Sequence, residues 1–142
     1  MSPSIVLASV RSGVVKILWV NTVPENSASL ETILQHSTPQ WTLIERTTLA
    51  FAFEALADGG ISVLLCDADL HPHSWRDLLA HLGCLPDAPP LIVTSRLADE
   101  WLWAEALNLG AHDVLARPFD PTEVVRSIHS AWLRWNGRRR AA

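Results

Sequence analysis

The chain has 142 residues and a formal net charge of −4, with 49% hydrophobic and 18% charged residues. This length and composition indicate one globular domain with its own core, and they exclude a disordered chain. The acidic balance argues against a general nucleic-acid binder, and no stretch resembles a signal peptide or a membrane span. The two cysteines lack a disulfide framework or zinc spacing, which suits a cytoplasmic location.

The first half of the chain is expected to form two strand–helix pairs after a loose leader at residues 1–13. A β-branched, apolar run at 14–20 predicts a buried strand, and either Asn26 or Ser27 is suited to cap the helix that follows. The apolar face of that helix would consist of Leu30, Ile33 and Leu34. The next strand and helix are expected at 41–47 and 49–57.

The second half continues the alternation. The continuous apolar run Ile61–Cys66 ends in Asp67, which is typical of a central parallel strand. Ser74 and Asp77 form a pattern that opens helices, as do Asp120 and Pro121. The remaining expected elements are a helix ending at Leu82, strands at 91–93 and 113–116, a helix at 99–109 closed by Gly110, a last helix to about Trp135, and a basic tail at 137–142.

Strands that alternate with helices in this way predict a parallel sheet covered on both faces. Functional sites in such sheets lie beyond the carboxyl ends of the strands. In this chain those ends carry Asn21, Thr22, Asp67, Thr94 and Arg117. We therefore expect these side chains to meet at one rim of the sheet.

Three stretches, 63–70, 91–95 and 106–119, have the residues, order and spacing of one known family. The third stretch contains a Gly-Ala turn, a short strand and Arg-Pro-Phe. Together they resemble the receiver domain of two-component response regulators, and the likeness makes 14–136 the expected receiver-like domain. The resemblance implies a three-layer α/β fold with five helices and a five-stranded parallel sheet of order 2-1-3-4-5, which is flavodoxin-like.

The resemblance also implies roles for individual residues. Asp67 matches the aspartate that accepts a phosphoryl group from a histidine kinase or phosphotransfer protein. Thr94 matches the hydroxyl that binds the phosphoryl oxygens. Arg117 stands where the family has a lysine, and the peptide bond before Pro118 is expected to be cis.

Several positions depart from the family pattern. Asn21 and Thr22 replace the two acidic residues that help to hold Mg²⁺, so Asp67 and the backbone carbonyl of Asp69 would be the main remaining ligands. Magnesium prefers oxygen ligands and usually needs one or two carboxylates, and phosphoryl transfer depends on charge neutralisation. The sequence therefore predicts a weakened Mg²⁺ site and weak or absent phosphorylation. Val114 replaces the aromatic residue that often serves as the family's conformational switch.

Two other functions remain open on the sequence. Asp67, His71 and His73 could serve a metal-dependent enzyme on the same fold, because histidine is a common metal ligand. The domain could also be a pseudo-receiver that binds partners without being phosphorylated. A flavodoxin-like cofactor binder is disfavoured, since the segment after the first strand has no glycine for a phosphate-binding loop.

The sequence contains seven tryptophans and no tyrosine. Trp103 and Trp132 fit core-facing positions, whereas Trp101 and Trp135 are expected to face partly outward as interface anchors. The family commonly dimerises through its fourth helix, fifth strand and fifth helix, which is where these residues fall. No output domain follows Trp135, so we expect a stand-alone receiver whose output is made by an unidentified downstream protein.

Overall fold

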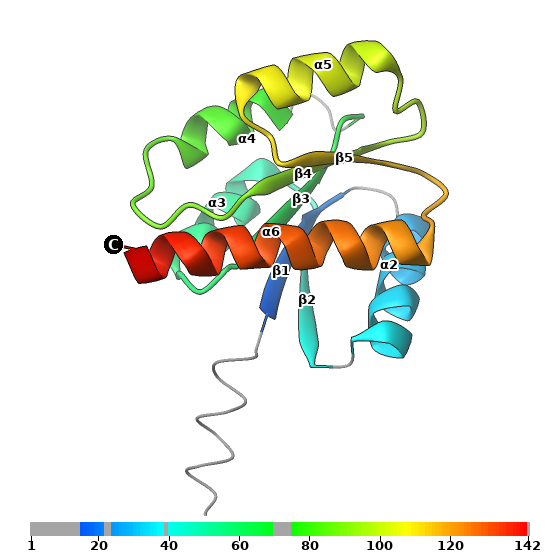
Figure 1. Ribbon diagram of the computed structural model, residues 1–142, viewed down its shortest axis with the longest axis horizontal. Helices are drawn as coiled ribbons and strands as arrows, with labels where there is room; N and C mark the ends of the chain where they lie inside the picture. The colour runs from blue at the N-terminus through cyan, green and yellow to red at the C-terminus, as the bar shows by residue number, and fades with distance from the viewer. Residues whose placement is uncertain (1–14, 22–23, 39, 70–74, 142) are drawn as a thin grey trace, which may run out of the picture.

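The computed structural model describes residues 15–21, 24–38, 40–69 and 75–141 of the chain. Strands and helices alternate along it (Figure 1), as the sequence predicts. The strands are β1 (Val15–Val20), β2 (Trp41–Arg46), β3 (Val63–Asp67), β4 (Leu91–Ser95) and β5 (Asp113–Ala116). The helices are α2 (Pro24–Ser37), α3 (Leu49–Ala57), α4 (Trp75–Leu82), α5 (Glu100–Leu109) and α6 (Pro121–Ala141).

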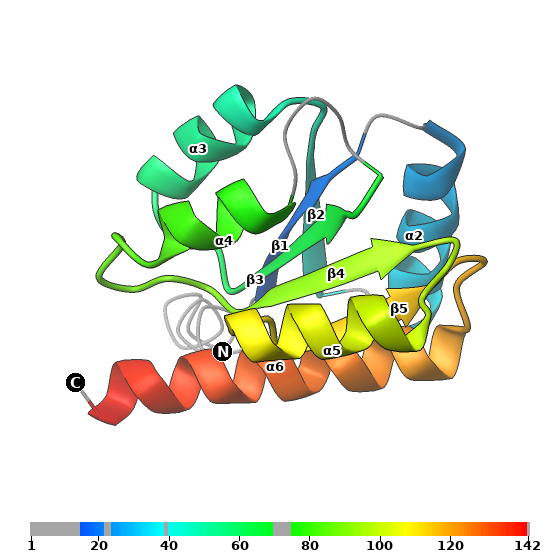
Figure 2. The ribbon, with the colours of Figure 1, turned by 90° about the horizontal axis from the view of Figure 1, so that it is seen from above.

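The five strands form one parallel sheet of order β2-β1-β3-β4-β5, so the expected topology is confirmed. Helices α3, α4 and α5 cover one face of the sheet, and α2 and α6 cover the other (Figure 2). Alternate residues of β1 feed the two cores: Leu18 and Val20 face α3 and α4, whereas Ile17 and Trp19 face α2 and α6. β3 and β4 are buried along their whole length because both of their faces are covered.

Local sequence signals explain where most helices begin and end. Thr48 caps α3 by accepting a hydrogen bond from the backbone N–H of Phe51, and Asp99 caps α5 in the same way. Gly110 ends α5 with a φ of 108°, a left-handed conformation that glycine adopts without a steric penalty. Pro121 begins α6 as expected. Ser74, expected to open α4, lies outside the described residues.

Two helix boundaries differ from the prediction. Helix α2 begins at Pro24, earlier than a cap at Asn26 or Ser27 would place it, because proline at the first helical position gives up no hydrogen bond. Helix α6 continues to Ala141, although the sequence predicted an end near Trp135. Arginine is a good helix former, so the basic segment extends the helix.

Two of the predicted tryptophan orientations are wrong. Trp103 is 40% exposed, because α5 buries the side of the helix that carries Leu102 and Ala106, and Trp103 lies about 100° around the axis from Leu102. Trp135 is only 8% exposed, because it packs against the 85–89 loop, where its indole Nε1 donates to the Asp87 carbonyl oxygen at 3.4 Å. Trp19 is fully buried and Trp132 partly buried, in agreement with the predictions.

No helix in the described ranges combines the length and the hydropathy needed to cross a bilayer.

Candidate functional site

Four side chains come together at the carboxyl rim of the sheet. Asn21 directly follows β1, Asp67 ends β3, Thr94 lies near the end of β4, and Arg117 follows β5. The register pairs Asp67 with Thr94, and the backbone N–H of Arg117 donates to the Ser95 carbonyl oxygen at 2.9 Å. The sheet itself therefore fixes the spacing of these residues.

Asp67 is a buried carboxylate, and the residue is 3% exposed. Its Oδ1 accepts a hydrogen bond from the backbone N–H of Asp69 at 3.0 Å, which folds the chain tightly after β3. The backbone N–H of Ala68 donates to the Thr94 carbonyl oxygen at 2.7 Å and extends the strand pairing past Asp67. A charged carboxylate at this depth requires a cation close to it.

Arg117 supplies that cation. Its Nη2 lies 3.1 Å from Oδ1 and 2.9 Å from Oδ2 of Asp67, and 3.1 Å from Oδ2 of Asp69. The Arg117 side chain is 10% exposed, whereas that of Asp69 is 53% exposed. Arg117 thus lies between the buried Asp67 and the exposed Asp69. The sequence predicts a role only for the backbone carbonyl of Asp69, and no sequence pattern signals this side-chain contact.

The loop after β5 has the geometry that the resemblance implies. The peptide bond between Arg117 and Pro118 is cis, so this expectation is confirmed. Phe119 packs edge-on against Trp19 of β1, with ring centroids 6.2 Å apart. This contact ties the loop that carries Arg117 to the centre of the sheet.

Two buried polar atoms of the cleft are unused. Within the described residues, neither the Thr94 hydroxyl nor Nε of Arg117 has a hydrogen-bond partner. An unsatisfied buried donor costs free energy comparable to a lost hydrogen bond. Both groups therefore suit a ligand that brings hydrogen-bond acceptors, such as phosphoryl oxygens.

The neighbouring residues show what surrounds Asp67 along the chain and on other strands of the sheet. Asn21 is buried, has a partner of its own, and donates its backbone N–H to the Arg46 carbonyl oxygen at 3.1 Å. Cys66 is buried beside Asp67, and burial, with a smaller contribution from the Asp67 charge, raises the pKa of its thiol to about 12. Val114 is buried on β5, so this position has no aromatic side chain to swing.

The donor set fits a magnesium ion poorly in this arrangement. Magnesium requires near-octahedral oxygen ligands at about 2.0–2.1 Å. Both oxygens of Asp67 face Arg117 instead, and Asn21 offers only a neutral amide oxygen. Thr22, His71 and His73 lie outside the described residues. Within the described part of the chain, no group of three His, Cys, Asp or Glu side chains is placed to hold a metal ion.

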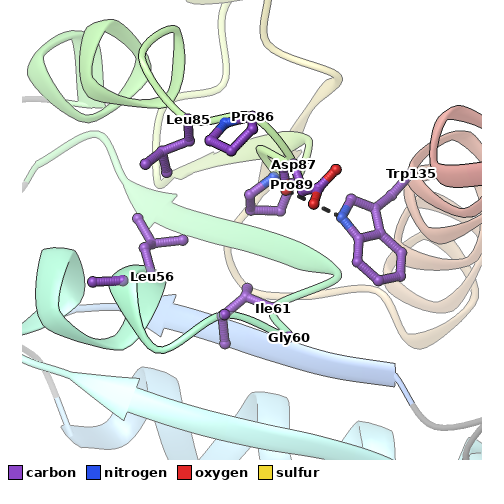
Figure 3. Close-up of a pocket in the computed structure, with 10 residues that line it drawn as sticks. Leu56, Gly60, Ile61, Leu85, Pro86, Asp87, Pro89 and Trp135 are labelled. Atoms are coloured by element: carbon purple, nitrogen blue, oxygen red, sulfur yellow. Dashed lines mark hydrogen bonds between the residues drawn. The ribbon is translucent and has the colours of Figure 1, made fainter. Parts of the chain in front are cut away.

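A hollow of about 280 Å³ lies at the other end of the sheet, where β3 and β4 begin (Figure 3). Trp135 forms one wall of it, and the opposing walls come from the end of α3 and the loop before β4. Its labelled lining residues are Leu56, Gly60, Ile61, Leu85, Pro86, Asp87, Pro89 and Trp135. None of these residues belongs to the rim with Asp67, so this hollow is separate from the candidate site.

Solved structures of receiver domains resemble this fold closely. The signal receiver domain of an HD domain-containing protein from Pseudomonas fluorescens Pf-5 matches with a TM-score of 0.74 and 23% identity, covering 90% of this chain and 93% of that one. The receiver domain of the Francisella response regulator 1452 matches with a TM-score of 0.72 and 18% identity, over 84% and 97% of the two chains. The chemotaxis response regulator CheY4 of Vibrio cholerae matches with a TM-score of 0.72 and 13% identity, over 83% and 98%.

These likenesses establish that the chain has the response-regulator receiver fold. No protein-family model matches the sequence, and no curated protein matches it.

Proposed function

We propose that this chain is a receiver-type signalling domain, in which Asp67 accepts a phosphoryl group with low efficiency and the output is made through protein contacts. The observation that carries the proposal is the arrangement around Asp67. The Thr94 hydroxyl and Nε of Arg117 are buried at the same rim with no hydrogen-bond partner among the described residues, and both can donate to phosphoryl oxygens. The receiver fold agrees with this role. So does a cytoplasmic location, where we expect a histidine kinase or phosphotransfer protein to be found.

In the proposed reaction, a carboxylate oxygen of Asp67 attacks the phosphorus of a phosphohistidine on a histidine kinase or phosphotransfer protein. The P–N bond breaks, its electron pair returns to the imidazole, and an acyl phosphate forms on Asp67. Arg117 balances the new charge, and the Thr94 hydroxyl donates to one of the transferred oxygens. Because Arg117 holds both oxygens of Asp67, attack first requires this ion pair to open, which slows the step.

Intact-mass measurement after incubation with acetyl phosphate or phosphoramidate and Mg²⁺ tests the assignment. We expect slow, partial gain of one phosphoryl group, and no gain in Asp67→Asn. Asp69→Asn is the matched control, because it makes the same change in the exposed partner of Arg117. Rapid and near-complete modification would contradict the predicted impairment, and modification that persists in Asp67→Asn would refute the role of Asp67.

A second candidate function is a pseudo-receiver that binds its partners without phosphorylation. One observation favours it: Asp67 is already paired with Arg117, so this buried carboxylate has a cation without a bound ligand. A protein that stays unmodified under all phosphodonor conditions, yet binds a partner, would support this alternative. Nothing in the described residues favours a metal-dependent hydrolase, and its two histidines lie outside them.

The face formed by α5, β5 and α6 is our proposed surface for a downstream protein or for a homodimer. Trp101 is 85% exposed on α5, Leu107 is exposed on the same helix, and Leu97 is exposed in the segment that precedes it. Large apolar side chains exposed on neighbouring turns mark interaction surfaces. Trp135 is not an accessible anchor of this surface, because it is buried.

A further inference from the structure

The acidic side chains at the carboxyl rim share one cation that belongs to the chain itself. Asp67 and Asp69 contribute two carboxylates, and the side chain of Arg117 contacts both. Asn21 is neutral and adds no negative charge to the rim. An acidic residue at this position would need a further cation close to it. Among the described residues of the cleft, the acids therefore already have a cation between them.

The contact has the geometry of a cation held by several oxygens. A single nitrogen, Nη2 of Arg117, lies 2.9–3.1 Å from three carboxylate oxygens of two aspartates. A fork-like pair would use two nitrogens on one carboxylate, and would leave Asp69 outside the contact. Here Nε has no hydrogen-bond partner in the part of the chain that the structure describes, as expected when the guanidinium is turned to place one nitrogen between the carboxylates.

We infer that Arg117 is a built-in cation that takes the place of a divalent metal at Asp67 and Asp69, so that this cleft is assembled without metal binding. The inference rests on the proposed function only in assigning this cleft as the signalling site, and it does not require phosphorylation. Arg117 and a divalent ion compete for the same oxygens, and their like charges repel at short range. A divalent metal can therefore bind these oxygens only when the Arg117 side chain moves away from them.

The chain holds Arg117 in this position from two sides. Its backbone N–H is bonded to Ser95 in β4, and the Phe119 ring two residues later packs on Trp19. Moving the guanidinium away would leave Asp67 as a buried, unpaired carboxylate, which is strongly unfavourable. The arginine is therefore a fixed part of the cleft, and it positions the Asp67 carboxylate.

Substituting the arginine tests this inference on the full chain, by isothermal titration with Mg²⁺ or Mn²⁺ and by thermal unfolding in the same salts. The unmodified protein is expected to show no saturable binding at millimolar metal. Arg117→Gln is expected to unfold at a lower temperature, and to bind the metal roughly tenfold more tightly or better. Its Tm is then expected to rise with metal concentration, because a ligand that binds only the folded state stabilises it.

Two further variants make the result specific. Arg96→Gln removes an exposed arginine directly after β4, at the same rim, and is expected to leave metal binding and Tm unchanged. Adding Asp67→Asn to Arg117→Gln is expected to abolish the gained binding. If Arg117→Gln does not fold, Arg117→Lys replaces it, because the shorter side chain contacts fewer oxygens and is expected to give a smaller gain in metal affinity.

Saturable binding of Mg²⁺ to the unmodified protein at millimolar or lower concentration would overturn the inference. Equal affinity in the unmodified protein and in the Arg117 variant that folds would overturn it as well. Neither result bears on whether Asp67 accepts a phosphoryl group, which the phosphodonor experiment reports separately. Failure of the inference and failure of the proposed function are therefore distinguishable.

Discussion

Replacing Trp135 with alanine is expected to lower the free energy of unfolding by about 3 kcal/mol. The ring is 8% exposed, and its Nε1 donates to the Asp87 carbonyl oxygen. Truncating a buried aromatic side chain costs about 3–5 kcal/mol, and we expect the lower end because this ring already borders a hollow of about 280 Å³. Trp135→Phe keeps most of the apolar area and loses the hydrogen bond, so its expected cost is about 1 kcal/mol.

Urea unfolding followed by circular dichroism measures these differences. For a chain of this length, a loss of about 3 kcal/mol lowers Tm by roughly 10 °C. Trp101→Ala is the matched control, because Trp101 is 85% exposed and its truncation is expected to change stability by less than about 0.5 kcal/mol. Equal losses in the two alanine variants would refute the reasoning from burial. Sedimentation of Trp101→Ala, compared with the unmodified protein, also tests the proposed dimer surface.

The remaining predictions concern Cys66 and two glycines, Gly110 and Gly137. Because burial raises the pKa of the Cys66 thiol to about 12, a thiol reagent near neutral pH should modify only the exposed Cys84 in the folded protein, and labelling of both would contradict this. The Cys66 thiol ionises near pH 9.0 in the unfolded chain, but its pKa in the folded protein is about 12. The free energy of unfolding should therefore fall as the pH rises above 9, and it should fall less in Cys66→Ala. Gly110→Ala should cost about 1–2 kcal/mol through its φ of 108° alone, since nothing lies within 4 Å of an added Cβ. Gly137→Ala, in the exposed part of α6, should raise the free energy of unfolding by up to about 1 kcal/mol. Urea unfolding in which both glycine variants change the stability in the same direction would refute these two predictions.

The architecture of this protein follows from local patterns in its sequence. Short apolar runs bounded by caps and glycines alternate with helical segments, and only a covered parallel sheet buries such runs on both faces. The same logic placed Asp67, Thr94 and Arg117 at the ends of strands, where a parallel sheet collects them at one rim. These signals are local, because hydrophobic periodicity, caps and glycines can be recognised in a segment without knowing which other segments it packs against.

The contacts between individual side chains, in contrast, became visible only in the folded chain. Nothing in the sequence indicates that the side chain of Asp69 shares Arg117 with Asp67, because their contact joins residues 48 positions apart through a rotamer choice. The same reason explains why Trp103 is exposed and Trp135 is buried, contrary to the prediction. Periodicity indicates which residues share a face of a helix, but it does not say which face is covered. The 85–89 loop covers Trp135, and only a narrow side of α5 is buried. Side-chain contacts of this kind depend on packing between distant segments, which a one-dimensional pattern does not encode.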